Sequence, residues 1–152
     1  MKAVEYRTRV APEWIDYNGH LQDAYFGLIF SYAVDAFQDA VGFDAAYRKA
    51  TGCTIYLLED HKFFLREVKE GADILVRTHL IGLWEKRFLL WSEMLCDGQP
   101  VATSELMELH VQQRPKPHGV AIPDDIRAAM EARLMPAEDI ARLEYRARAM
   151  RG

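Results

Sequence analysis

The chain has 152 residues, of which 50% are hydrophobic and 28% charged, and its formal net charge is −4. This length predicts one domain with a sizeable core, and the negative charge argues against general nucleic-acid binding, whose affinity comes largely from cationic contacts to phosphate. No apolar run approaches the roughly 20 residues of a membrane span, and the N-terminal segment lacks the long apolar stretch of a secretory signal.

The first part of the chain combines a short strand with a long helix. Residues 4–10 alternate between apolar and charged side chains, which predicts a strand with one face in water. Residues 22–41 carry apolar side chains at helical spacing and leave only a narrow polar stripe, so we expect a buried helix inside something concave. Gly42 favours the backbone that ends helices, and a shorter helix is expected around residues 44–50.

From residue 54 the spacing of apolar side chains changes from helical to extended. Four strands are predicted, over residues 54–68, 72–84, 86–96 and 100–113. Gly82 is expected at a bulge or a strand end, and Asp97–Gly98 is typical of a tight hairpin turn. Because the connections are short, we expect these strands to form an antiparallel meander.

Two helices are predicted after the last strand. Pro123 and the acids that follow it begin the first, with Ile126, Met130 and Leu134 on its inner face. Pro136 begins the second, which would place the arginine-rich tail, residues 146–151, at a helix C-terminus, where cations are favoured.

This order of elements predicts an α+β protein with the hotdog fold, in which one antiparallel sheet wraps around a long central helix. The chain would be a single domain, with a core over residues 4–113 and a helical extension over residues 123–150. A sheet of this kind has an exposed edge strand, which such proteins cover by pairing with another copy. We therefore expect a homodimer or a tetramer.

Polar side chains gather in the loop just before the long helix, where Asp16, Asn18, Gly19 and His20 lie within five positions. The N-terminus of a helix carries unpaired N–H groups and a partial positive charge, which can polarise a carbonyl. An acid placed there can act as a nucleophile or as a general base on water. The alternative is structural, because aspartate also caps helices and forms Asx-turns.

The sequence DYNGHLQDAYF at residues 16–26 resembles the signature of the 4-hydroxybenzoyl-CoA thioesterase family of hotdog enzymes. On that resemblance Asp16 matches the catalytic aspartate, Gly19–His20 the Gly-His pair, and Phe26 the usual tyrosine. The family's Asn-Asn pair is Gln22–Asp23 here, which departs from the pattern. The segments PEWIDYNGH, HKFFLREV and VATSELMELHV are also similar to the betainyl-CoA thioesterases that accompany carnitine dehydrogenase in bacteria.

The resemblance implies a cytoplasmic acyl-CoA thioesterase that uses no metal or bound cofactor. The hypothesis is hydrolysis of betainyl-CoA to glycine betaine and CoA, with Asp16 as the catalytic residue. The substrate-binding residues would be Asn18, Gly19, His20, Asp23, Tyr25, Phe26 and Glu105. The alternatives are a thioesterase for another short or aromatic acyl-CoA, a hotdog hydratase, and a protein that binds acyl thioesters without hydrolysing them.

Glu105 stands out because the residues that alternate with it on the last strand are apolar or nearly so. A buried carboxylate needs a partner. That partner would be Arg87 or Lys62, or else a cationic acyl group recognised by Glu105 or Asp23 together with nearby aromatic rings.

We expect no metal site, since the histidines on the predicted strands form no HxxxH pair and the two cysteines are isolated. Cys53 and Cys96 are predicted to be buried free thiols in a reducing cytoplasm.

Overall fold

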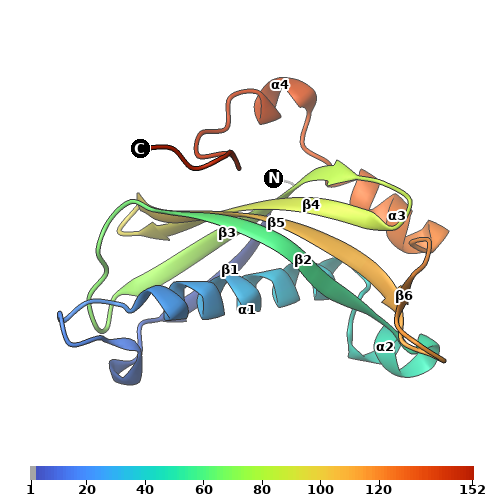
Figure 1. Cartoon of the computed structure of the whole chain (residues 1–152), viewed down its shortest axis with the longest axis horizontal. Helices are drawn as coiled ribbons and strands as arrows, with labels where there is room; N and C mark the ends of the chain where they lie inside the picture. Colours follow the sequence, from blue (N-terminus) through green and yellow to red (C-terminus); the bar gives the residue numbers. More distant parts are fainter. Residues whose placement is uncertain (1–2) are drawn as a thin grey trace.

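The computed structural model describes residues 3–152 as one six-stranded antiparallel sheet curved around a long helix (Figure 1). The strands are β1 (Val4–Arg9), β2 (Cys53–Phe64), β3 (Asp73–Leu83), β4 (Arg87–Cys96), β5 (Gln99–Gln112) and the short β6 (His118–Gly119). The helices are α1 (Asp23–Val41), α2 (Ala45–Thr51), α3 (Asp124–Glu131) and α4 (Ala137–Ile140), with a 3-10 turn, η1, at Pro12–Trp14. The predicted hotdog arrangement is confirmed.

One side of α1 is buried on the concave face of the sheet. Its buried residues recur three or four positions apart, and they are Phe26, Ile29, Phe30, Ala33, Val34, Phe37 and Val41. Phe37 is fully buried and stacks on Phe88 of β4, with 6.2 Å between the ring centroids. Gly42 ends the helix with φ at +112°, a left-handed conformation that glycine adopts readily. The other side of the helix is open in a single chain, where Tyr32 is 42% exposed.

The predicted meander is wrong for β2. The strand order is β1-β3-β4-β5-β2, so β2 pairs with β5 and not with its neighbour in sequence, β3. The connection between β2 and β3 crosses the end of the sheet, where the N–H of Leu65 donates to the carbonyl of Val101 and the N–H of Gly71 donates to that of Val10. Val68 of this connection is buried in the core, which is why its apolar residues resemble a longer strand. As a result β2 is an edge strand.

Two local predictions on the strands are confirmed. The register of β3 against β4 shifts between Leu80 and Gly82, as expected for a bulge at this position. Asp97 and Gly98 both have positive φ, +52° and +74°, which suits the tight turn between β4 and β5.

The C-terminal residues divide between the two faces of the sheet. Ile126 and Met130 of α3 are buried in the same cluster as Phe37, as predicted. The last helix is shorter than expected: α4 ends at Ile140, and the tail beyond it is not helical. The tail crosses the convex face, opposite α1 (Figure 1), where the guanidinium of Arg146 and the N–H of Ala147 both donate to the buried carboxylate of Glu105. These bonds favour an extended tail over a helix.

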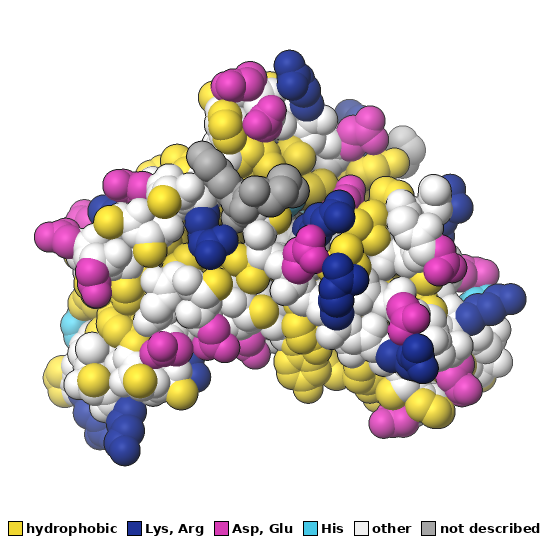
Figure 2. All heavy atoms as spheres, turned by 180° about the vertical axis from the view of Figure 1, so that it is seen from behind, with side chains coloured by type: hydrophobic (Ala, Val, Ile, Leu, Met, Phe, Trp, Pro, Cys, Tyr) yellow, Lys and Arg dark blue, Asp and Glu magenta, His cyan; other side chains and the backbone are white. Residues whose placement is uncertain are grey.

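No helix within residues 3–152 is long and apolar enough to cross a membrane. On the face seen in Figure 2, acidic and basic side chains are interspersed.

The tail can be tested through its ion pair. The Glu105 side chain is 9% exposed and that of Arg146 is 36% exposed, so removing Arg146 leaves a nearly buried carboxylate without its cation. We expect Arg146→Ala to lower the free energy of unfolding by about 1–3 kcal/mol, less than for a fully buried pair because Arg146 is partly hydrated. Arg142→Ala, at an exposed tail position, is the control and should change it little. Equal urea midpoints for the two variants would contradict the importance of the pair.

Candidate active site

The loop before α1 has a fixed shape, because backbone hydrogen bonds close its base. Ile15 and Leu21 form an isolated antiparallel bridge, and the N–H of Gln22 donates to the carbonyl of Trp14 at 3.0 Å. The N–H of Leu21 also donates to the carbonyl of Val68 at 2.7 Å, which ties the loop to the β2–β3 connection. The residues between Ile15 and Leu21 therefore stand at the N-terminus of α1 with little freedom.

Asp16 is half-buried at the start of this loop. One of its carboxylate oxygens, Oδ1, accepts the N–H of Asn18 at 2.8 Å and that of His20 at 3.3 Å. This is the Asx-turn that the sequence left open as the structural alternative. The other oxygen, Oδ2, makes no hydrogen bond with any residue from 3 to 152 and remains available to a reacting group. The structural and chemical roles of Asp16 are therefore compatible.

Asp16 lines an open cleft of about 790 Å³, which lies between the loop before α1 and the residues around the end of β2. The loop before α1 and the first helical residues form one side, with Asp16, Tyr17, Asn18, His20, Leu21, Gln22, Asp23 and Phe26. The end of β2 and the residues that follow it form the other, with Phe64, Leu65, Arg66 and Glu67. This second side was not predicted from the sequence. The apolar Val68 between the charged Glu67 and Lys69 was the signal in the sequence that the segment packs against the core.

Gly19 and His20 help to hold the loop in shape. Gly19 has φ at +82°, a conformation that side chains disfavour, and adding a Cβ there would meet no other atom, so the backbone angle is what requires glycine. His20 Nε2 lies 3.0 Å from Glu67 Oε2, a contact that joins the two sides of the cleft.

The first turn of α1 borders the cleft through Asp23 and Phe26. The N–H of Ala24 donates to the carboxylate of Asp23 at 2.8 Å, and that of Tyr25 to the carbonyl of Gln22 at 2.9 Å. Asp23 is thus an anion at the positive end of the helix, which stabilises the helix terminus. It also occupies a donor that a substrate carbonyl could use.

The two aromatic residues predicted to touch substrate lie in different places. Phe26 is 4% exposed, lines the cleft, and meets Phe64 edge to face with 5.3 Å between centroids. Tyr25 does not line the cleft; it stacks on Trp14 at 6.0 Å and packs against the core. Phe26 therefore gives the cleft an apolar floor, and Tyr25 supports the loop from behind.

Glu105 lies apart from this cleft. It is on the convex face of the sheet and takes Arg146 as its partner, not Arg87 or Lys62 as the sequence suggested. The structure does not bring it near Asp16, because the inner face of β5 carries the other alternating set of residues, from Ala102 to His110. Within one chain, Glu105 contributes to the attachment of the tail.

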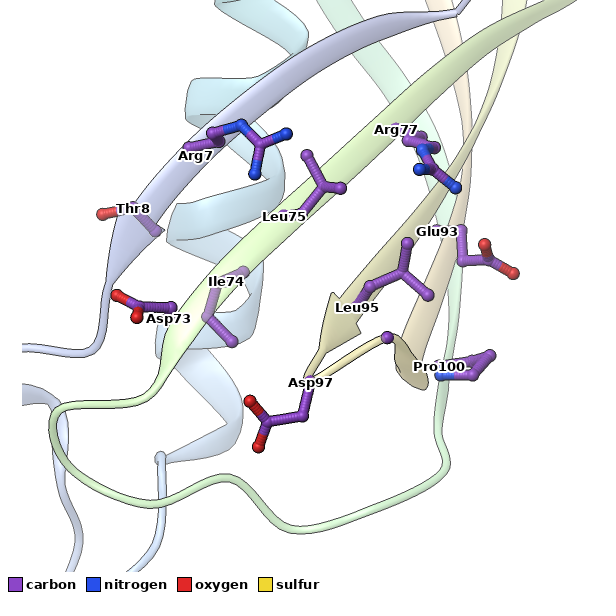
Figure 3. Close-up of a pocket in the computed structure, with 11 residues that line it drawn as sticks. Arg7, Thr8, Asp73, Ile74, Leu75, Arg77, Glu93, Leu95, Asp97 and Pro100 are labelled. Carbon is purple, nitrogen blue, oxygen red and sulfur yellow. The ribbon is translucent and has the colours of Figure 1, made fainter.

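Another open cavity, of about 760 Å³, lies on the outer face of β1, β3 and β4, with α1 on the opposite side of the sheet (Figure 3). Its lining mixes Arg7 and Arg77 with Asp73, Glu93 and Asp97. Burial raises the pKa of the Glu93 carboxyl, and the nearby Arg77 opposes that rise. Within residues 3–152 no helix residue lines this cavity, so it lacks the helix N-terminus that borders the Asp16 cleft.

Known proteins of similar sequence include thioesterases, as the hotdog fold and the Asp16 cleft would suggest. Residues 10–130 match the model of the thioesterase-like superfamily. A betainyl-CoA thioesterase of Pseudomonas aeruginosa is 49% identical over 108 residues, which cover 70% of this chain and 68% of that protein. An L-carnitine dehydrogenase/betainyl-CoA thioesterase of Agrobacterium fabrum is 40% identical over 119 residues, and the match covers 78% of this chain but only 24% of that longer protein.

Solved structures give the same fold. A putative thioesterase of Pseudomonas putida KT2440 has a TM-score of 0.82 and 32% identity, and the alignment covers 99% of this chain and 97% of that one. A hypothetical protein of Staphylococcus aureus, solved in complex with CoA, has a TM-score of 0.82 at 22% identity, over 98% of this chain and 96% of that one. The chain therefore belongs to the thioesterase-like superfamily and is a thioester hydrolase with the hotdog fold.

Proposed function

We propose that this thioesterase hydrolyses betainyl-CoA to glycine betaine and free CoA. The observation that carries the proposal is the 49% identity to the betainyl-CoA thioesterase of Pseudomonas aeruginosa, which extends over 70% of the chain. The enzyme would act in the cytoplasm, where the free thiols of Cys53 and Cys96 stay reduced.

Asp16 is the catalytic residue of this proposal. Its unbonded oxygen, Oδ2, either removes a proton from the water that attacks the thioester carbon or attacks that carbon itself. In the second route the mixed anhydride with Asp16 is then hydrolysed. In both routes the carbon–sulfur bond breaks and CoA leaves as a thiolate that takes up a proton. The oxygen of the water that attacks the acyl carbon ends in the carboxylate of glycine betaine, and in the second route this attack also regenerates the Asp16 carboxylate.

Backbone N–H groups in the first turn of α1 would stabilise the developing oxyanion. The Ala24 N–H becomes available only when the Asp23 carboxylate turns away from it. Gly19 shapes the loop, and Asn18 and His20 border the substrate. Phe26 forms the apolar floor, and the guanidinium of Arg66 in the cleft can meet a CoA phosphate.

A second copy of the chain would cover the edge of the sheet at β2. Exposed large apolar side chains are concentrated on this strand, where Tyr56, Leu57, Leu58 and Phe64 are 39–53% exposed. Pairing two β2 strands antiparallel about a two-fold axis would satisfy both edges and bury these side chains. The same axis would lay the two α1 helices antiparallel, with the Asp16 loop of one chain facing the C-terminal half of the partner helix.

Asp16→Asn tests the chemistry. Because Oδ1 of the amide can still accept the two N–H groups of the loop, thermal stability should change little. We expect kcat to fall by about a hundredfold or more, the usual scale for loss of a positioned acid or base. The measurement is release of CoA thiol under saturating substrate. Turnover near the wild-type rate would reduce Asp16 to a loop residue.

The substrate is tested with a pair of CoA esters of equal shape. 3,3-Dimethylbutanoyl-CoA has a carbon where betainyl-CoA has the cationic nitrogen. We expect kcat/KM to be about 30-fold higher for betainyl-CoA, since an ammonium that leaves water for an acidic or aromatic site gains roughly 2 kcal/mol. A panel with aromatic and other short acyl-CoAs completes the comparison, and equal values across it would leave a general thioesterase.

The edge strand is tested with Leu58→Asp. A charge on an edge strand opposes pairing with another copy. We expect light scattering to give a dimer or larger assembly for the wild type and a monomer for this variant. Met150→Asp, which alters an apolar side chain that is 89% exposed in the tail, should leave the assembly intact. A monomeric wild type would contradict the pairing.

A further inference from the structure

A smaller cavity, of about 180 Å³, lies between α1, β2 and β5, further along the helix than the Asp16 cleft. About half of its lining is apolar, including Phe30, Val34, Ile55 and Leu106. Three carboxylates also line it, from Asp35 on α1, Asp60 on β2 and Glu108 on β5. We refer to it below as the acidic cavity.

Glu108 is the unusual member of this set. Its side chain is 3% exposed, yet within residues 3–152 it forms no hydrogen bond or ion pair. A buried carboxylate without a partner is unfavourable, and proteins seldom keep one unless it serves a ligand or a reaction. Glu105, two positions earlier and on the other face of the same strand, shows the contrast, because it has both a guanidinium and a backbone N–H.

The cavity already holds one cation of the chain itself. The ammonium of Lys62 pairs with Asp60 and lies 6.0 Å from the centroid of the Phe30 ring. A carboxylate and an aromatic face can both attract a cation that has no N–H group to donate. This single ammonium is outnumbered by the three carboxylates of the lining, so the ionised cavity keeps an excess of negative charge that another cation would reduce.

We propose that the acidic cavity binds the quaternary ammonium end of the acyl group, with Glu108 as the specificity-determining carboxylate. The inference rests on the proposed function, and it names the part of the chain that would select a cationic substrate. The volume of about 180 Å³ has room for about six groups the size of a water molecule, enough for the nitrogen, its three methyl groups and the adjoining methylene. Apolar walls suit the methyl groups, and the carboxylates supply the charge.

Asp16 and the acidic cavity must come from different chains to act on one substrate. Asp35 lies twelve residues beyond Asp23 on α1, about 18 Å along the helix axis. In a betainyl group the nitrogen is only two bonds from the carbonyl carbon. The two-fold pairing proposed above would resolve this, because it would turn the Asp16 loop of one chain toward the C-terminal half of the partner's α1, where the acidic cavity lies.

The charge of Glu108 gives the site a pH dependence. Burial raises the pKa of this carboxyl to about 7, and the charges of Asp35 and Asp60 add to the rise. The charged groups that line the cavity with it are Asp35 from α1 and Asp60 and Lys62 from β2. Because a cation is bound by the ionised form, preference for the cationic substrate should increase as the pH rises through about 7.

The test is Glu108→Gln, assayed with betainyl-CoA and 3,3-dimethylbutanoyl-CoA. We expect the ratio of the two kcat/KM values to fall by about 30-fold, through a higher KM for betainyl-CoA, while the neutral ester changes by no more than about twofold. The pH dependence of the ratio near 7 should disappear. Glu93→Gln, a half-buried glutamate on the convex face, is the matched control and should keep both.

The fold of the variant is checked by thermal unfolding. When the pKa of a carboxyl is raised in the folded state, the protein loses stability as the pH rises from the unfolded pKa of that group through its folded pKa. Glu108→Gln should therefore unfold at the same temperature as the wild type at pH 5 and at an equal or higher temperature at pH 8. A Glu108→Gln enzyme that is folded and keeps the wild-type substrate ratio overturns the inference, and the proposed function then stands without it.

Co-expression of an Asp16→Asn chain with a Glu108→Gln chain, purified through two different tags, tests the assignment to separate chains. In the mixed dimer one site has both native residues, so the KM for betainyl-CoA should return to the wild-type value. The KM of Glu108→Gln alone would contradict a site shared between chains.

Direct binding separates failure of the site from failure of the proposed substrate. Choline carries the trimethylammonium group without the thioester, and its binding can be measured by calorimetry. If the wild type hydrolyses betainyl-CoA poorly but binds choline in a manner lost in Glu108→Gln, the cation site stands and the proposed substrate falls. If choline binding is the same in both proteins or absent from both, and no substrate preference depends on Glu108, the cation site is overturned.

Discussion

Burial of one side of α1 against the concave sheet is the constraint on which the rest of this structure depends. Seven apolar side chains of the helix, from Phe26 to Val41, are removed from water by it. At roughly 1.5–3 kcal/mol for each large side chain, this is a leading favourable contribution to folding. Because the helix cannot shift without exposing that side, its N-terminus is held in a fixed position. The loop that carries Asp16 is fixed in turn by its bonds to Trp14 and Val68.

The two faces of β5 illustrate how the same residue type can serve different purposes. Glu105, on the convex face, is neutralised by Arg146 and holds the tail against the sheet. Glu108, on the concave face, lies under α1 beside other acids and has no partner within residues 3–152. The first arrangement is typical of structure, where a buried charge is paired. The second is typical of a site whose partner arrives from outside the chain.

Much of the fold could be predicted from the sequence because the signals are local. The helical spacing from Phe26 to Val41, the bulge at Gly82 and the turn at Asp97–Gly98 each depend on a few neighbouring residues. The pairing of β2 with β5 could not be predicted in this way, since it depends on where a long connection crosses the sheet. The predicted end of the last helix was also wrong, because the tail that follows Ile140 is hydrogen-bonded to Glu105, about 40 residues earlier in the sequence.

The candidate site was likewise predicted where its residues are neighbours in the sequence, and missed where they are not. Asp16, Asn18, Gly19, His20 and Phe26 were identified from one contiguous segment, and all lie in the loop or at the start of α1. Glu105 was singled out because the face it occupies reads as apolar, but on this strand both faces are covered, one by α1 and the other by the tail. Glu108 was missed for that reason. It alternates with Leu106 and His110, and this was the signal that it faces the core.

The most direct measurement is a crystal structure with a non-hydrolysable analogue of betainyl-CoA, in which a methylene separates the CoA sulfur from the carbonyl. We expect the carbonyl at the N-terminus of α1, within reach of Asp16, and the trimethylammonium group against Phe30 and Glu108 of the partner chain. An analogue bound on the convex face, or one whose ammonium group points into solvent, would contradict it.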